Sequence, residues 1–295
     1  MKTKKILAAL LIGCICGFTA CSNDDEILNS VADIVKINSS INGADPTTRA
    51  YINDYTGIGN FEAGDTWGMY ATVGGSHVLT NSAYTVGTTN LLWSALSETA
   101  PVTFAAHYPL ITSTITDPTA YMFNAATVTN PDLLVATPVT KSKGEAVDLT
   151  FNHVMHQLAI NLSAGLEIPG SLFDVTVTLL NMKSSAKVNL LTGVVDVSAA
   201  SGADAYPVKD VAELFFVAPQ QLTQGTDWIQ VDLAGKTYIF KVPASLTDLQ
   251  SGKRQVLTLT LKKKPDGTTT VILTDQGITG WTNQGGTING NADEQ

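Results

Sequence analysis

Short apolar runs separated by turn-forming residues recur along the chain from Tyr51 onward, and no long segment shows a helical period. The runs are rich in Val, Thr, Leu, Tyr and Phe, with Gly, Asn, Asp or Pro between them. In the segment Val256–Leu261 the three leucines fall on one face of a strand, because strand side chains alternate between faces. Many short strands with one buried face are typical of β-sandwiches. The sequence therefore predicts an all-β protein.

The expected strands divide into two halves of similar size. We place the boundary near residue 184, which gives an N-terminal β-sandwich at residues 50–184 and a C-terminal β-sandwich at residues 185–295. Val147–Leu162 is expected as one long, bent strand, and Ala234-Gly235 as a two-residue hairpin turn. The other expected strands are Thr66–Val73, Thr80–Val86, Asn90–Trp93, Val102–Tyr108, Leu133–Thr137, Phe173–Asn181, Lys187–Val197, Glu213–Val217, Trp228–Leu233, Lys236–Val242, Val256–Lys262, Thr268–Thr274 and Ile278–Trp281.

The N-terminus has the organisation of a bacterial export signal. Lysines near the start precede an apolar segment, residues 6–20, which is too short to span a bilayer. The segment Phe18-Thr19-Ala20-Cys21 resembles the lipobox of bacterial lipoproteins, in which the cysteine is acylated and becomes the first mature residue. We therefore expect a lipoprotein signal peptide at residues 1–20 and lipid on Cys21.

Cys21 also determines the expected location of the protein. Several acyl chains on one cysteine anchor a protein stably, whereas a single chain binds a membrane only marginally. The acidic cluster Asp24-Asp25-Glu26 follows at once and resembles the surface-export tag of lipoproteins in gut and oral anaerobes. This pattern predicts a protein exposed on the cell outer membrane. Residues 21–49 are mostly polar and are expected to form a flexible tether or propeptide.

Cysteine usage and charge exclude several classes of protein. Cys14, Cys16 and Cys21 are the three cysteines of the chain, so the segment after Cys21 has no thiol for a disulfide, a metal cluster or a nucleophile. The formal net charge is −9, and the arginines are Arg49 and Arg254. A nucleic-acid partner is not expected, because such a partner requires a basic surface.

Motifs for catalysis or metal binding are weak in this sequence. His153 and His156 are three residues apart, a spacing that points them to opposite faces of a strand, and no H-E-x-x-H motif is present. No G-x-S-x-G elbow occurs, and Gly57-Ile58-Gly59 lacks the third glycine of a dinucleotide-binding loop. We therefore predict no catalytic residue, no metal site and no cofactor.

Several segments together resemble the fimbrillin family, the subunits of type V pili and related surface adhesins of gut and oral anaerobes. They occur in the family's order and span nearly the whole chain. These segments are Thr48–Ala50, Phe61–Ala71, Val102–Pro109, Asp132–Ala136, Leu149–Leu158 and Gly277–Trp281. The resemblance implies two tandem transthyretin-like β-sandwiches. It also implies a non-catalytic structural subunit or tip adhesin of a cell-surface fimbria.

The resemblance further implies a route of assembly. An arginine-specific protease removes the segment before the mature domain, and a strand of a neighbouring subunit fills the groove that this uncovers. Here the cut would fall between Arg49 and Ala50, and the leaving strand would be Ile34–Ile41. The candidate donor strand is Thr268–Trp281, with Val271, Leu273, Ile278 and Trp281 as its apolar side chains. The expected partners are other fimbrial subunits, the outer membrane through Cys21, the protease, and a host or glycan ligand.

Two other functions remain open at this point. A surface glycan-binding lipoprotein of a polysaccharide-uptake system would stack sugar rings on exposed aromatic side chains such as Trp93 or Trp228. Tryptophans in strands, including Trp67 and Trp281 here, are more often core or interface residues. An extracellular glycan hydrolase would need two carboxylates that converge in a cleft, and the acidic residues of this chain are scattered.

Overall fold

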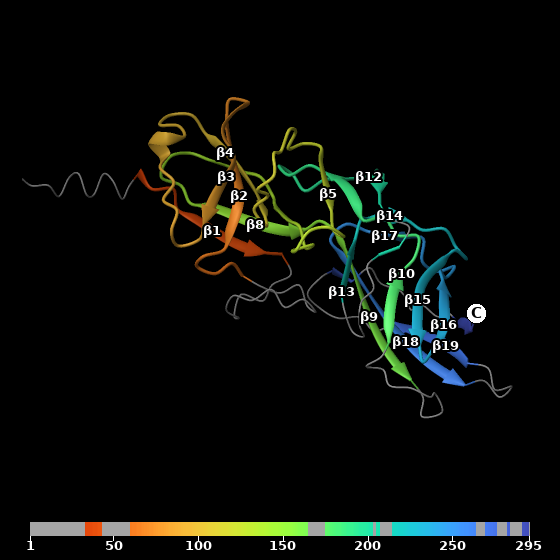
Figure 1. Ribbon diagram of the computed structural model, residues 1–295. Helices are drawn as coiled ribbons and strands as arrows, with labels where there is room; N and C mark the ends of the chain where they lie inside the picture. The colour runs from red at the N-terminus through yellow and green to blue at the C-terminus, as the bar shows by residue number, and fades with distance from the viewer. Residues whose placement is uncertain are drawn as a thin grey trace, which may run out of the picture.

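The computed structural model describes residues 33–42, 60–164, 175–202, 205–206, 214–263, 269–275, 282–283 and 291–294. Their regular secondary structure is almost entirely β-strand, so the prediction of an all-β sandwich protein is confirmed. The count of two tandem sandwiches stays a prediction. Figure 1 shows an elongated molecule, with β1, β2 and β3 towards one end and β16, β19 and the C-terminus towards the other.

One sheet of seven strands is built from the first half of the chain. The strand order is β1-β8-β6-β4-β2-β3, and β7 pairs with β4. β1 runs parallel to β8, whereas the other pairs are antiparallel. The strands are β1 (Ile37–Ile41), β2 (Thr66–Val73), β3 (Ser76–Thr85), β4 (Val102–Tyr108), β6 (Leu134–Ala136), β7 (Val139–Lys141) and β8 (Val147–His153).

A second sheet of nine strands is built from the second half. The order is β10-β15-β16-β21-β19-β18-β9-β13, and β20 pairs with β18. β18 runs parallel to β9 and β20. The strands are β9 (His156–Ala164), β10 (Thr176–Leu179), β13 (Leu214–Val217), β15 (Asp227–Leu233), β16 (Lys236–Lys241), β18 (Lys253–Lys263), β19 (Thr269–Asp275), β20 (Thr282–Asn283) and β21 (Asn291–Glu294).

Two smaller sheets complete the described fold. β5 (Tyr121–Asn124), β11 (Ser185–Val188) and β12 (Val195–Ser201) form a sheet in the order β12-β11-β5, which lies between the two large sheets (Figure 1). β14 (Gln220–Gln221) pairs with β17 (Asp248–Leu249). The three-stranded sheet takes strands from both sides of residue 184. The division into two domains near this residue stays a prediction.

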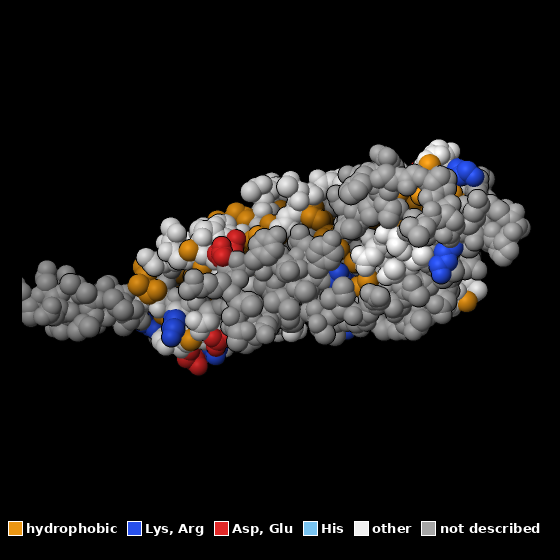
Figure 2. Space-filling view, turned by 90° about the horizontal axis from the view of Figure 1, so that it is seen from below, with side chains coloured by type: hydrophobic (Ala, Val, Ile, Leu, Met, Phe, Trp, Pro, Cys, Tyr) orange, Lys and Arg blue, Asp and Glu red, His pale blue; other side chains and the backbone are white. Residues whose placement is uncertain are grey.

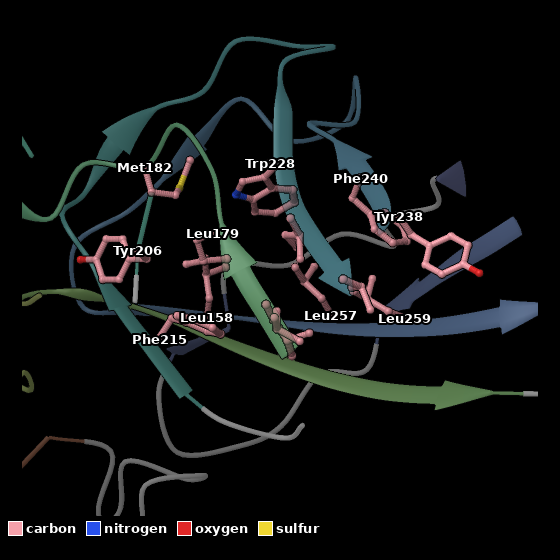
Figure 3. Close-up of a cluster of buried hydrophobic side chains, with 14 of the residues drawn as sticks. Leu158, Leu179, Met182, Tyr206, Phe215, Trp228, Tyr238, Phe240, Leu257 and Leu259 are labelled. Atoms are coloured by element: carbon pink, nitrogen blue, oxygen red, sulfur yellow. The ribbon is translucent and has the colours of Figure 1, made fainter. Parts of the chain in front are cut away.

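Alternation of side chains gives the seven-stranded sheet two buried faces. On β2, Trp67 and Met69 enter one apolar cluster, and Tyr70 next to them enters another. The first cluster includes Val35 and Ile41 from the N-terminal segment, and the second is shared with the three-stranded sheet. The nine-stranded sheet has its own apolar core, in which Trp228 and the neighbouring aromatic and leucine side chains converge (Figure 3).

Three local predictions were wrong or incomplete. Val147–Leu162 is not one bent strand, because β8 ends at His153 and β9 begins at His156 in a different sheet. Asn90–Trp93 is not a strand, because Trp93–Ala95 forms the 3₁₀ turn η1, with the Trp93 side chain buried beneath it. Lys187–Val197 is divided into β11 and β12 by a turn around Gly193, whose N–H donates to the carbonyl of Asn189. Within the described residues, no helix has the length and apolar character required to cross a membrane.

Candidate strand-exchange site

β1 forms one outer edge of the seven-stranded sheet and contacts it through β8 alone among the strands of that sheet. Its five residues, Ile37–Ile41, pair in parallel with Val147–Phe151, so the two strands lie 110 residues apart in sequence and side by side in space (Figure 1). The pairing extends beyond the strand, because the N–H of Asn42 donates to the carbonyl of Phe151 at 2.8 Å. The N-terminal segment thus supplies a complete edge strand. The prediction of a strand within Ile34–Ile41 is confirmed.

The inward face of this segment is apolar and deeply buried. Val35 is 3% exposed and Ile41 is 2% exposed, and Ile37 packs against the same cluster from a half-buried position. The cluster includes Trp67 and Phe151, so the N-terminal segment closes the core at this edge. Full burial of an aliphatic side chain contributes about 1.5–3 kcal/mol. The buried face therefore provides most of the free energy that holds the segment in place.

The outward face of β1 carries a ladder of polar contacts with β8. Asn38 donates from Nδ2 to Oδ1 of Asp148 at 2.7 Å, and Asn42 donates from Nδ2 to Oδ1 of Asn152 at 2.9 Å. Between them, the hydroxyl of Ser40 lies 3.4 Å from that of Thr150. Because these groups are exposed to water, each contact adds little net free energy. The ladder fixes the register of β1 more than it stabilises the pair.

A carboxylate anchors the N-terminal end of the same segment. Asp33 accepts a hydrogen bond from the backbone N–H of Ser94 at 3.1 Å and another from the Ser94 hydroxyl. The ammonium group of Lys143 lies 3.2 Å from Oδ1 of Asp33 and 2.6 Å from Oε2 of Glu98. The Ser94 side-chain hydrogen bond, followed by the contact with Lys143, holds the pKa of Asp33 below its ordinary value. Acidic and basic side chains lie close together near one end of the molecule (Figure 2).

Most of the site residues predicted from sequence lie outside the described residues. These are Cys21, Arg49, Ala50, Ile278 and Trp281. Val271 and Leu273 lie on β19, where they pair with Leu261 and Leu259 of β18. β19 also pairs with β21, so the candidate donor strand occupies an internal position in the nine-stranded sheet.

The tryptophans that would serve a glycan-binding surface are core residues. Trp93 is 0% exposed and Trp228 is 1% exposed, and Trp67 is equally buried. Figure 3 shows the Trp228 indole directed into the apolar core of the nine-stranded sheet. The expectation that Trp93 or Trp228 offers an exposed face for sugar stacking is therefore wrong, because each ring supports a hydrophobic core instead. Trp281 lies outside the described residues.

The histidines serve structural roles in the described part of the chain. His153, on β8, contacts the Asp132 carboxylate at 2.9 Å, whereas Nδ1 of His156, on β9, lies 3.0 Å from the Gln250 carbonyl. His107 is buried on β4, with Nε2 3.0 Å from Oδ1 of Asn81. Burial lowers the pKa of both His107 and His156 to about 4. Among the described side chains, no three of the His, Cys, Asp and Glu type are grouped to hold a metal ion.

The contacts of Asp33 with Ser94 and Lys143 were not predicted from the sequence. No local pattern marks these residues, because 61 residues separate Asp33 from Ser94. One signal was available in the alternation of Val35, Ile37 and Ile41, which predicts that the tether contains a strand with a buried face. Asp33 is the acidic residue that comes just before this alternation.

The fold and the site define an all-β protein whose outer sheet edge is formed by its own N-terminal segment. The fimbrillin-like family matches residues 48–281, and the chain belongs to it. The prediction of this family is confirmed, and membership supports a fimbrial or cell-adhesion role at the cell surface. No curated protein matches the chain.

Solved structures from Bacteroides species share the fold. A candidate cell adhesion protein from Bacteroides uniformis is similar with a TM-score of 0.58 and 18% identity, covering 84% of this chain and 98% of that chain. A candidate cell adhesion protein from Bacteroides ovatus gives a TM-score of 0.59 and 16% identity, covering 85% of this chain and 99% of that one. A third candidate cell adhesion protein, from Bacteroides thetaiotaomicron, gives a TM-score of 0.50 and 20% identity, covering 80% of this chain and 94% of that one.

Proposed function

We propose that this chain is a non-catalytic structural subunit or tip adhesin of a cell-surface fimbria, assembled by donor-strand exchange. In this proposal it is exported as a lipoprotein on Cys21, reaches the outer membrane and is cut after Arg49 by an arginine-specific protease. The observation that carries the proposal is the position of β1. This strand precedes the proposed cut and forms a sheet edge, and it places Ile41 in the core, where Val35 just before it is also buried.

A cut after Arg49 would leave β1 attached by non-covalent contacts alone. Its departure would expose the backbone donors and acceptors of β8 and an apolar slot beside Phe151. An unpaired edge of this kind is a template for a strand from another chain, because the incoming backbone satisfies β8 and its side chains fill the slot. A strand supplied by a neighbouring subunit would therefore repair the sheet and link the two subunits.

The burial of Arg254 supports a single point of processing. The chain has two arginines, Arg49 and Arg254. Arg254 lies on β18 with 1% of its surface exposed, and it pairs with Gln157 of β9 on one side and Asn283 of β20 on the other. A protease requires an accessible, extended segment, so native Arg254 is protected. An arginine-specific protease would therefore act on the folded protein at Arg49.

The arrangement of the two sheets suits head-to-tail assembly. β1 lies towards one end of the elongated molecule, and β19 and the C-terminus lie towards the other (Figure 1). Contacts between unlike ends propagate into a fibre when the rotation from one subunit to the next does not close a ring. The proposed donor, with Val271, Leu273, Ile278 and Trp281, would have to leave the sheet around β19. Donation would therefore require β19 to give up its pairing with β18 and β21.

The proposal is tested by blocking the cut on cells that express the chain. Arg49→Ala and Arg49→Lys should both retain full-length lipoprotein and abolish fibres, because the lysine keeps the charge but not the arginine that the protease requires. A variant with an unrelated protease site in place of Arg49-Ala50 should form fibres only after that protease is added. N-terminal sequencing should find Ala50 as the first residue of the assembled subunit. Unchanged fibres from Arg49→Ala would overturn the proposal.

A further inference from the structure

The groups that bind Asp33 would also meet the strand that replaces β1, an inference that rests on the proposed strand exchange. We propose that the slot vacated by β1 contains a carboxylate-binding subsite formed by Ser94 and Lys143. The slot would therefore select an extended strand of another subunit that carries Asp or Glu two residues before its first buried aliphatic side chain.

The subsite is built from groups that all favour an anion. The backbone N–H and the hydroxyl of Ser94 both donate to the Asp33 carboxylate, and the Lys143 ammonium group lies 3.2 Å from it. Ser94 belongs to η1, and Lys143 precedes β8, so they approach from two different elements. Glu98 contacts Lys143 at 2.6 Å, which positions the ammonium group even when Asp33 is absent. Hydrogen bonds to an ionised acceptor are stronger than those between neutral groups.

The remaining contacts set the position of this carboxylate along the strand. The Val35 N–H donates to the Leu91 carbonyl, and the Lys36 carbonyl accepts from the Val147 N–H, each at 2.8 Å. The side chains of Val35 and Ile41 are buried, at two and eight residues after Asp33. Because a shift of one residue would turn every inward side chain outward, the slot fixes both register and direction. Counting from the position of Asp33 as zero, the slot therefore recognises a carboxylate at position zero and aliphatic residues at positions two and eight.

The chain's own candidate donor does not carry this pattern. Between residues 268 and 281 the acidic residue is Asp275, and it is followed at position two by Gly277 and at position eight by Asn283. A glycine cannot fill the space that Val35 occupies, so this segment would lose either the carboxylate contact or the aliphatic contact. The subsite therefore favours a strand from a different subunit over a second copy of this chain.

Synthetic peptides with the purified protein test this inference. The protein carries an engineered protease site in place of Arg49-Ala50, and after cutting, the released segment is removed. The first probe is the labelled peptide of residues 33–42, and the second is the same peptide with Asp33→Asn. A peptide of residues 268–281 is the third probe. Ser40→Ala in the first peptide is the control, because Ser40 faces outward and its hydroxyl contact is 3.4 Å long.

Fluorescence anisotropy should give a dissociation constant about tenfold weaker for the Asp33→Asn peptide, because the negative charge that strengthens the hydrogen bonds from Ser94 and attracts Lys143 is lost. The Ser40→Ala peptide should bind as the unaltered peptide does, and the 268–281 peptide should bind more weakly than either. In a Lys143→Gln protein, the difference between the unaltered peptide and the Asp33→Asn peptide should shrink. Equal binding of these two peptides to the unaltered protein would overturn the subsite but not strand exchange. Failure of the unaltered 33–42 peptide to bind would overturn both.

Discussion

The strength with which the rest of the protein binds β1 can be measured by substituting Ile41. Ile41 ends β1, pairs with Phe151 and is 2% exposed, whereas the adjacent Ser40 is exposed on the opposite face. Replacement of a buried isoleucine by alanine costs about 2–5 kcal/mol. The slot lies at a sheet edge that can relax in part, so we expect about 3 kcal/mol, which corresponds to roughly a 150-fold change in an equilibrium constant. Ser40→Ala should change the same constant by about twofold at most.

The assay uses the purified chain beginning at Cys21, which is then the sole cysteine and carries a fluorescent label instead of lipid. An engineered protease site replaces Arg49-Ala50, and dissociation of the labelled segment after cutting is followed by anisotropy. Ile41→Ala should release the segment much faster than the unaltered chain, and Ser40→Ala should release it at nearly the unaltered rate. A competing unlabelled 33–42 peptide prevents rebinding.

An internal control is built into this comparison. Once the segment has left, the unaltered, Ile41→Ala and Ser40→Ala proteins have identical sequences from the cut onward, so their urea unfolding curves must coincide. Equal release rates for Ile41→Ala and Ser40→Ala would refute the reasoning, because they would show that the buried face does not retain the strand. Unfolding curves that still differ would show that release of the segment was incomplete.

Three further predictions concern stability and processing. Burial lowers the pKa of His107 and His156 to about 4, so as the pH falls below about 6.5 the unfolded chain takes up protons that the folded chain does not. In urea unfolding, each histidine should therefore lower the free energy of unfolding by up to roughly 3 kcal/mol by pH 4. His156→Gln should make the free energy of unfolding less dependent on pH. Gly252→Ala should lower the melting temperature more than Gly235→Ala, although both glycines have positive φ. A Cβ on Gly252 would lie 2.7 Å from the His153 carbonyl oxygen, whereas a Cβ on Gly235 would meet nothing within 4 Å. Limited digestion with an arginine-specific protease, analysed by mass spectrometry, should cut the native chain after Arg49 and cut after Arg254 only in denaturant, because Arg254 is buried.

Strands whose pattern is local were predictable from the sequence. β2 and β4 have the predicted bounds, Thr66–Val73 and Val102–Tyr108, because alternating apolar residues are bounded there by turn residues. The hairpin at Ala234-Gly235 was predictable as well, and both residues have positive φ, as a two-residue hairpin turn requires. In these places sequence neighbours determine the structure, so the sequence is informative.

Features that depend on distant partners were not predictable. The interruption between β8 and β9 at Val154-Met155 follows an uninterrupted run of strand-like residues. β8 ends there because the chain passes from one sheet to another. The partner of β1 is 110 residues away, and the donors to Asp33 lie on two other elements. Short strands such as β7 carry too few residues to show a period. For the candidate site, the sequence predicted the strand but not the side chains that anchor it.

The junction between the two large sheets explains how a contact at β1 can matter to the whole subunit. The chain passes from β8 to β9 through Val154 and Met155, and the Ser251 hydroxyl donates to the Val154 carbonyl at 2.7 Å. The Gly252 N–H donates to the Met155 carbonyl at 3.1 Å, and His156 contacts the Gln250 carbonyl. The loop before β18 holds the junction on this side, and β18 then pairs with β9, so the junction is tied into the nine-stranded sheet. A rotation of the seven-stranded sheet about this junction would strain these hydrogen bonds, a restraint that a linker of the same length without them would lack.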